Sequence, residues 1–179
     1  MVLSGIWKRY ENSKEPIPPN LVIRHNKDVP PEDVQEICAS VGWSRREPLL
    51  ITKALENSLA VVSAWDEAHM VGFARATGDK VFNATIWDVV VRPSHQRRGI
   101  GLLIMHELLK DLDTYDIPLV TLYADPGTDG FYRRFGFMAR PFGRARYVQR
   151  KALLEAEYLV KTVTVGVQAL SCSVGHAKV

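Results

Sequence analysis

Apolar positions in this chain follow two spacings, and the order of the segments predicts an α/β fold. Five short apolar runs have the β-branched content and the turn-bounded length of strands. They lie at residues 21–24, 59–65, 70–77, 85–91 and 119–125. Elsewhere apolar residues recur three and four positions apart, as on the buried face of a helix. This alternation predicts a sheet covered by helices.

Four helices are expected between and after these strands. Proline and acidic residues at 30–33 open the first helix, which Gly42 ends. The second helix passes through Ile51 and Leu55, and the third follows Gly101 with a long apolar face. A short fourth helix follows the strand at 119–125 and ends at Gly136.

The segment between the strand at 85–91 and the third helix has the chemistry of an anion site. Its loop, residues 96–101, is Gln-Arg-Arg-Gly-Ile-Gly. Two guanidinium groups and the N–H groups of a helix N-terminus favour a pyrophosphate. Gly99 and Gly101 allow close approach of the backbone, because neither has a Cβ. The dinucleotide and P-loop patterns are both missing, since their glycine spacing and the Gly-Lys-Ser/Thr sequence are absent.

This strand–loop–helix segment resembles motif A of the GNAT superfamily of N-acetyltransferases. The run Phe131–Phe137 resembles motif B of the same superfamily. The resemblance implies an α/β GNAT fold, with a mixed, mostly antiparallel sheet flanked by helices in a single domain. It also implies acetyl-CoA as the acetyl donor and no metal. The implied acetyl-CoA-binding residues are Val89, Val90, Val91, Gln96, Arg97, Arg98, Gly99, Ile100, Gly101 and Leu102.

A narrower branch, the GNAT proteins of plant plastids and cyanobacteria, is similar over residues 32–137. The most specific match is the run Phe-Asn-Ala-Thr-Ile-Trp-Asp at 82–88. Members of that branch are described as serotonin (arylalkylamine) N-acetyltransferases and as protein lysine acetyltransferases. The resemblance therefore implies a small amine or a protein lysine as acceptor. It ends before the aromatic terminal strand of that branch.

Acetyl transfer needs a group that removes a proton from the amine, because a primary ammonium has a pKa of about 10.4. Asp88 is the candidate base, and strand alternation places it on one face with Ile86 and Val90. The alternative role for Asp88 is a structural salt bridge with Arg75. The resemblance implies Tyr132 as the acid that protonates the CoA sulfur, and its alternative role is packing at a helix–sheet junction.

Three further residues are weaker candidates for an acceptor pocket: Trp43, Phe82 and Asn83. An indole at Trp43 suits an aromatic amine, although packing in the core is an equal alternative. A different class of function is a non-catalytic acetyl-CoA-binding module. Such a module would need neither Asp88 nor Tyr132.

Length, charge and cysteine content limit the classes of protein to which this chain can belong. The chain has 179 residues and a net charge of +3, which fits one soluble domain. This charge is too small to argue for nucleic-acid binding. No apolar run approaches the roughly 20 residues of a membrane span. Cys38 and Cys172 provide neither a disulfide framework nor a metal-ligand spacing.

We expect an irregular lead-in at residues 1–20, an acetyltransferase core at 21–140 and a divergent extension at 141–179. Within the extension, a helix is expected at 151–158 and a β-rich stretch at 159–168. The β-rich stretch is a candidate for pairing in a homodimer. The N-terminus has neither the apolar core of a secretory signal nor a long Ser-rich transit region. This predicts a cytoplasmic bacterial chain or the mature form of a plastid stromal protein.

Overall fold

The computed structural model describes residues 17–142 and 145–150. Contacts divide the chain into two units, Met1–Ile117 and Pro118–Val179. The helix expected at 151–158, the β-rich stretch at 159–168 and most of the lead-in at 1–20 lie outside the described residues. Among those described, no helix combines the length and apolar character of a membrane span.

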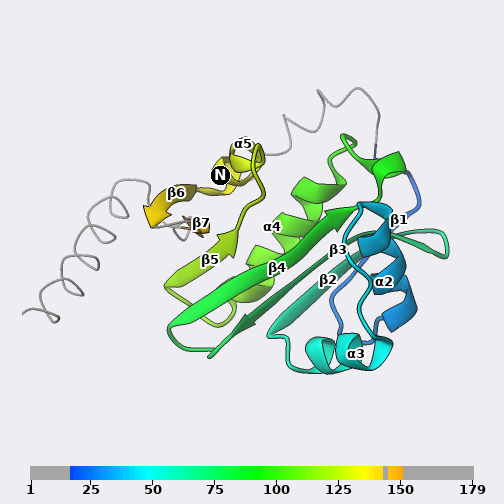
Figure 1. The fold of residues 1–179 in the computed structure, drawn as a ribbon, viewed down its shortest axis with the longest axis horizontal. Coiled ribbons are helices and arrows are strands. Elements are labelled where there is room, and N and C mark those ends of the chain that lie inside the picture. The colour runs from blue at the N-terminus through cyan, green and yellow to red at the C-terminus, as the bar shows by residue number, and fades with distance from the viewer. Residues whose placement is uncertain (1–16, 143–144, 151–179) are drawn as a thin grey trace, which may run out of the picture. The chain divides into compact units, whose positions relative to one another are not determined.

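The first unit is built on four antiparallel strands in the order β1-β2-β3-β4 (Figure 1). The strands are β1 (Leu21–Arg24), β2 (Ala60–Asp66), β3 (His69–Gly78) and β4 (Asn83–Val91). Each predicted strand is confirmed, with its ends displaced by no more than two residues. A two-residue turn joins β2 and β3, and Glu67 in it has a φ of 55°.

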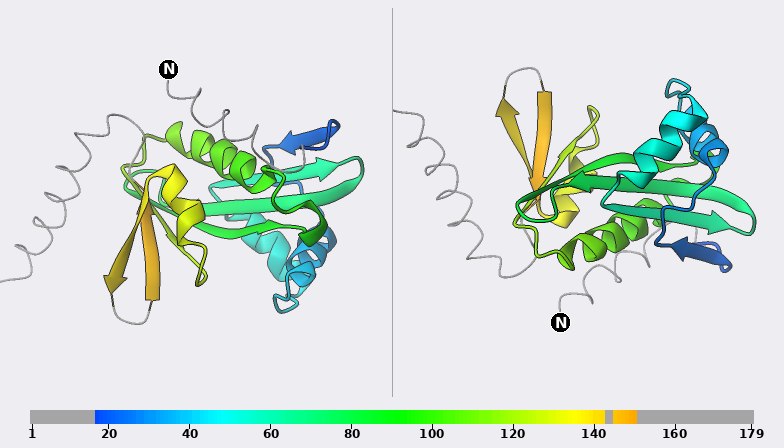
Figure 2. Two further views of the ribbon diagram at one scale, coloured as in Figure 1. Left: turned by 90° about the horizontal axis from the view of Figure 1, so that it is seen from above. Right: turned by 90° about the horizontal axis from the view of Figure 1, so that it is seen from below.

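Helices cover both faces of these strands. The helices α2 (Pro31–Ser40) and α3 (Pro48–Glu56) lie on one face, and α4 (Ile100–Asp113) lies on the other (Figure 2). All three predicted helices are confirmed. Prolines at the first positions of α2 and α3 suit helix starts, because these positions need no N–H donor.

One core cluster lies under α2 and α3. Its buried members are Val29, Val34, Ile37, Cys38, Ile51, Leu55, Val61, Trp65, Met70, Phe73 and Val90. Trp43 packs against this cluster and is half-buried. Cys38, on α2, is therefore a core residue.

On the opposite face, α4 packs very closely on β3. A Cβ added at Gly72 would overlap the side chain of Ile104 and lie 3.2 Å from Ile100. Ile100 and Ile104 are completely buried. This packing fixes the N-terminus of α4, and with it the loop at 96–101, relative to the sheet.

A β-bulge interrupts β4 at the candidate base. Val90 lies opposite Phe73, but Trp87 lies opposite Arg75, so β4 has one extra residue between these pairs. Asp88, within the bulge, has a φ of 54°. Paired residues share a face, so Trp87 and Val90 lie on the same face.

The prediction that Ile86 shares a face with Asp88 and Val90 is therefore wrong. Ile86 pairs with Ala76, and so it lies on the face opposite to that of Val90. The bulge is the physical reason, because one extra residue reverses the alternation on either side of it.

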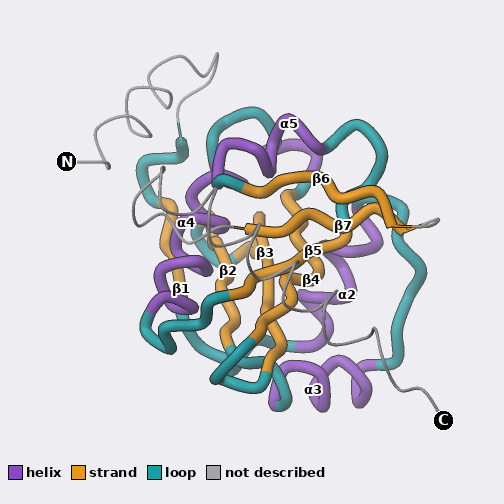
Figure 3. The backbone as a smooth tube through the Cα atoms, turned by 90° about the vertical axis from the view of Figure 1, so that its left-hand side faces the viewer, coloured by secondary structure: helices purple, strands orange, loops and turns teal. Residues whose placement is uncertain are grey.

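The second unit contains β5 (Leu119–Tyr123), α5 (Asp129–Tyr132), β6 (Phe137–Phe142) and β7 (Ala145–Arg150). A 3-10 turn, η2 (Arg133–Phe135), follows α5 and ends at Gly136, whose φ is 79°. Strand β7 lies between β5 and β6 and is antiparallel to both (Figure 3). The predicted strand and short helix are confirmed. The hairpin of β6 and β7 was not predicted, and it runs past residue 140; the boundary between core and extension stays a prediction.

Candidate active site

The loop before α4 has the backbone of an anion-binding site. Arg97 and Gly99 both have left-handed backbone conformations, with φ values of 63° and 92°. Loops of this type turn successive N–H groups toward a common point. Within the described part of the chain, no side chain caps the N-terminus of α4. Its first N–H groups are therefore available to a phosphate.

Side chains in the loop divide into anchoring and exposed groups. The Gln96 side chain donates a hydrogen bond of 3.0 Å to the carbonyl oxygen of Val91, which ties the loop to β4. Ile100 is buried in the core, so its N–H is the only part of it that could reach a ligand. Arg97 is exposed, and Arg98 is half-buried.

The remaining predicted acetyl-CoA contacts are backbone positions. The Val90 side chain is buried in the core, whereas Val89 and Val91 are half-buried. Gly101 and Leu102 belong to the first turn of α4. The predicted contacts of these residues with acetyl-CoA would be made by their backbone groups, and this binding role stays a prediction.

Arg92, directly after β4, makes its contacts outside the loop at 96–101. Its guanidinium contacts Glu36 at 2.9 Å and donates to the carbonyl oxygen of Met70 at 3.3 Å. Arg92 therefore secures the end of β4 to α2 and β3.

Asp88 lies between two arginines on the face covered by α2 and α3. Arg75 Nε donates to Asp88 Oδ2 at 2.6 Å. Arg46 donates to Oδ1 at 3.1 Å and to Oδ2 at 3.3 Å. The exposed fractions of the side chains are 8% for Asp88, 15% for Arg75 and 50% for Arg46. The salt bridge with Arg75, the alternative role considered for Asp88, is thus present.

These contacts leave the carboxylate with acceptor capacity. An ionised carboxylate has about four lone-pair sites, and the two arginines use three of them. The arrangement therefore fixes the carboxylate and still permits one more hydrogen-bond donor. The catalytic role of Asp88 stays a prediction.

The charge of Asp88 affects two neighbours. Burial first, and the charge of Asp88 second, raise the pKa of the Cys38 thiol to about 11. The hydrogen bond to Asp88 raises the pKa of Arg46. Cys38 is therefore a neutral thiol and Arg46 a permanent cation at physiological pH.

Two tryptophans lie close in the sequence to Asp88 or to its partner Arg46. Trp43 belongs to the connection between α2 and α3, which also supplies Arg46. Trp87 directly precedes Asp88, and it donates a hydrogen bond of 2.9 Å to the Thr77 hydroxyl. Trp87 is 37% exposed, because it lies on the sheet face away from α4 and outside the core cluster. Alternation with its buried neighbour Ile86 was the signal that could have shown this.

Phe82 and Asn83 lie elsewhere, at the turn between β3 and β4. Phe82 is 70% exposed, and the Asn83 side chain donates to Asp79 at 2.7 Å. Six residues of strand separate Phe82 from Asp88, a distance of about 20 Å. The structure therefore does not bring Phe82 and Asn83 together with Asp88.

Tyr132 belongs to the second unit and is buried among aromatic rings. It makes edge-to-face contacts with Phe131 and Phe137, at centroid distances of 5.0 and 6.2 Å. Burial first, and the charge of Asp125 second, raise the pKa of Tyr132 to about 12. The packing role considered for Tyr132 is observed, and a phenol that keeps its proton is compatible with the predicted acid.

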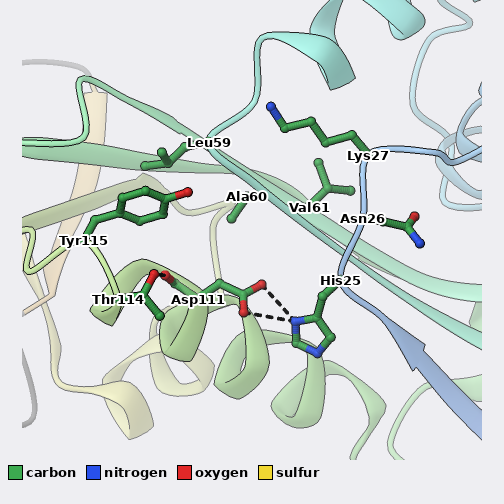
Figure 4. A pocket seen from close by; sticks show the side chains of 9 residues that line it. All are labelled: His25, Asn26, Lys27, Leu59, Ala60, Val61, Asp111, Thr114 and Tyr115. Atoms are coloured by element: carbon green, nitrogen blue, oxygen red, sulfur yellow. Dashed lines mark hydrogen bonds and ion pairs between the residues drawn. The ribbon is translucent and has the colours of Figure 1, made fainter.

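One cavity lies at the other end of α4 from the loop. It has a volume of ≈ 250 Å³, and His25, Lys27, Asp111 and Tyr115 are among its lining residues (Figure 4). His25 Nδ1 is 2.9 Å from Asp111 Oδ2. Asp111 is eleven residues from Ile100, or about 16 Å along the helix. This cavity is therefore separate from the loop at 96–101. The described residues contain no cluster of three metal-ligating side chains.

Comparison with known proteins identifies the family. The model of the "Acetyltransferase (GNAT) family" matches residues 29–137, which extend across both units. A protein of Gracilaria tenuistipitata var. liui, named "Uncharacterized N-acetyltransferase ycf52", is 41% identical over 128 residues, or 69% of this chain and 70% of that protein.

Two plant relatives have names that give different acceptors of the acetyl group. "Histone acetyltransferase TAP1" of Glycine max is 38% identical over 134 residues, or 69% of this chain and 58% of that protein. "Serotonin N-acetyltransferase 2, chloroplastic" of Oryza sativa subsp. japonica is 44% identical over 113 residues, or 60% of this chain and 56% of that protein. The match spans less than two thirds of either plant protein.

The α/β fold with antiparallel strands flanked by helices is the one that the sequence predicted. GNAT acetyltransferases use acetyl-CoA, and the binding of its pyrophosphate by the loop before α4 stays a prediction. With the family model covering more than half of its length, the chain belongs to the GNAT acetyltransferase family and is an enzyme that acts on amino groups.

Proposed function

We propose that this enzyme transfers acetyl directly from acetyl-CoA to an arylalkylamine such as serotonin or tryptamine. The observation that carries the proposal is the position of Asp88, a fixed carboxylate with spare acceptor capacity directly after a partly exposed indole, Trp87. The carboxylate can receive an amine, and an indole face suits an aromatic ring. The name of the rice relative supports the same acceptor.

In this proposal Asp88 is the base, acting on the amine directly or through one water. The loop at 96–101 and the N-terminus of α4 hold the pyrophosphate of acetyl-CoA, which supplies the thioester. Val89, Val90 and Val91 offer backbone groups to its pantetheine arm. Tyr132 donates its phenolic proton to the departing sulfur; its raised pKa of about 12 means that it carries this proton at neutral pH.

A protein lysine is the second candidate acceptor, which the name of the soybean relative favours. The charges near Asp88 argue against a strongly basic peptide. Arg45 and Arg46 are both exposed in the connection between α2 and α3, and like charges repel a polycationic tail. A small amine with one charge meets less of this repulsion.

Release of CoA thiol from acetyl-CoA tests the proposal, with tryptamine, serotonin, a lysine peptide or no acceptor. Release above the background with the two indole amines is expected. Release with the peptide alone would assign the enzyme to protein acetylation.

The variant with both Asp88→Asn and Tyr132→Phe separates an enzyme from a binding module. We expect the variant to bind acetyl-CoA in calorimetry like the wild type, but to lose kcat by at least about a hundredfold. Turnover close to that of the wild type would show that neither group acts in the reaction.

The compartment is a separate part of the proposal. The rice relative is named chloroplastic, which supports a plastid stroma for this chain as well. Fractionation of cells of the source organism, with an antibody against the chain, tests this; recovery outside plastids would contradict it.

A further inference from the structure

The two arginines that bind Asp88 differ in origin and exposure. Arg75 lies on β3, the strand next to Asp88, and is largely buried, with a short contact of 2.6 Å. Arg46 comes from the connection between α2 and α3, and half of its side chain is exposed. Arg75 is thus part of the sheet, whereas Arg46 contacts the carboxylate from the solvent side.

This difference determines which contact can be exchanged. An exposed ion pair is weak, because water and salt compete for both partners. Removal of a buried partner is far more costly, because the remaining charge stays poorly solvated. A cation arriving from solvent would therefore replace Arg46 and leave Arg75 in place.

We propose that Arg46 occupies the position of the acceptor's ammonium group on Asp88 and is displaced when the amine binds. The inference rests on the proposed function, in which Asp88 receives the amine. The arriving ammonium donates to Oδ1, where Arg46 donates at 3.1 Å. Asp88 then keeps two cationic partners throughout, and the released guanidinium returns to water.

Such an exchange makes Arg46 an internal competitor of the ammonium group for Asp88. A neutral acceptor of the same shape cannot replace the charge of the guanidinium, so it would leave Arg46 in place. Breaking the ion pair between Arg46 and Asp88 costs free energy, and this cost weakens the binding of the amine.

The test compares Arg46→Gln with Arg46→Lys and with Arg45→Gln. Arg45 carries the same charge in the same connection but is not a partner of Asp88 among the described residues. Tryptamine binding is measured by calorimetry in the presence of CoA, beside its KM and kcat in turnover. The alcohol analogue of tryptamine, which has no ammonium, is measured in the same way as a competitor.

Arg46→Gln is expected to bind tryptamine about two- to fivefold more tightly, the range expected for loss of an exposed ion pair. Arg46→Lys and Arg45→Gln should remain close to the wild type. Affinity for the alcohol should be the same in all four proteins. Unchanged or weaker tryptamine binding by Arg46→Gln would overturn the exchange, as would an equal gain for the alcohol.

The binding measurement also separates this inference from the proposed function. Tighter tryptamine binding without turnover in any of the proteins would support the exchange and contradict the proposed reaction. Turnover without a change in tryptamine affinity in Arg46→Gln would support the proposed reaction and contradict the exchange.

Discussion

At the scale of single residues, Asp88 depends on an unusual backbone conformation. A positive φ of 54° costs a residue with a side chain of order 1–3 kcal/mol, although aspartate tolerates it better than most. The bonds to Arg46 and Arg75 offset this cost. The side chain could be singled out from the sequence, because a carboxylate is unexpected in an apolar strand, but its face and its partner Arg46 could not.

Tyr132→Phe is expected to lower kcat by about a hundredfold while KM for acetyl-CoA changes little, because only the proton donor is lost. With a pKa of about 12, the Tyr132 phenol is protonated at every pH well below that value. The alkaline fall of activity in the wild type should therefore not come from this group. Stopped-flow turnover from pH 6 to 10 checks both points, and a Phe variant with normal kcat would leave Tyr132 a packing residue.

Cys38 should resist alkylation in the folded protein at about pH 8, because its thiol is buried and neutral. Its raised pKa also links stability to pH. The folded state keeps the proton longer than the unfolded state, whose ordinary value is 9.0, so stability falls as the pH rises from 9.0 to about 11. Mass spectrometry of the Cys38 peptide after iodoacetamide treatment, with and without urea, measures the protection. Rapid labelling without urea would contradict it.

At the scale of elements, the fit between α4 and β3 sets the position of the loop at 96–101. The helix presents Ile100 and Ile104 to Gly72, the residue of β3 that has no side chain. The spacing of apolar residues was enough to predict this helix and its buried face. It could not predict which residue of the sheet would receive them, because that depends on tertiary packing.

Gly72→Ala should destabilise the protein by about 1–3 kcal/mol through overpacking against Ile104. Urea unfolding measures the change in the free energy of unfolding. Gly130→Ala is the matched control, because an added Cβ there meets no atom within 4 Å. Equal stability of the two variants would show that α4 can shift freely on the sheet.

Most helices and strands could be predicted from the spacing of apolar residues, whereas the strands β6 and β7 could not. Strands β1 to β5 and helices α2 to α4 are marked by apolar spacing and by turn residues at their ends. The hairpin of β6 and β7 carries Pro141 and several arginines, which obscure the alternation of a strand. The bulge at Asp88 was unpredictable as well, because register is a property of two strands and not of one.

At the scale of the whole molecule, the candidate base and the candidate acid belong to different units. Asp88 lies in Met1–Ile117 and Tyr132 in Pro118–Val179, whereas the family match runs through both. In the proposed reaction each unit supplies one group, so we expect ligand binding to stabilise the folded chain.

Acetyl-CoA at about a hundred times its Kd should raise the stability by about 2.7 kcal/mol and hence raise Tm. Arg97→Ala should weaken acetyl-CoA binding by about tenfold, since a charge-assisted phosphate contact is lost, and should reduce the gain in Tm. Lys53→Ala removes a similar exposed charge from α3 and serves as the control. Differential scanning calorimetry with and without acetyl-CoA measures the gain in Tm for both variants. An equal gain in Tm for the two variants would place the pyrophosphate elsewhere.

The bulge in β4 also has an evolutionary consequence. Deletion of the Asp88 codon would bring Val89 opposite Ala74 and restore uninterrupted pairing between Phe73–Val90 and Arg75–Trp87. A chain without this residue would thus have an ordinary strand here. Gain or loss of the candidate carboxylate would then be a one-codon insertion or deletion, which comparisons restricted to substitutions would overlook.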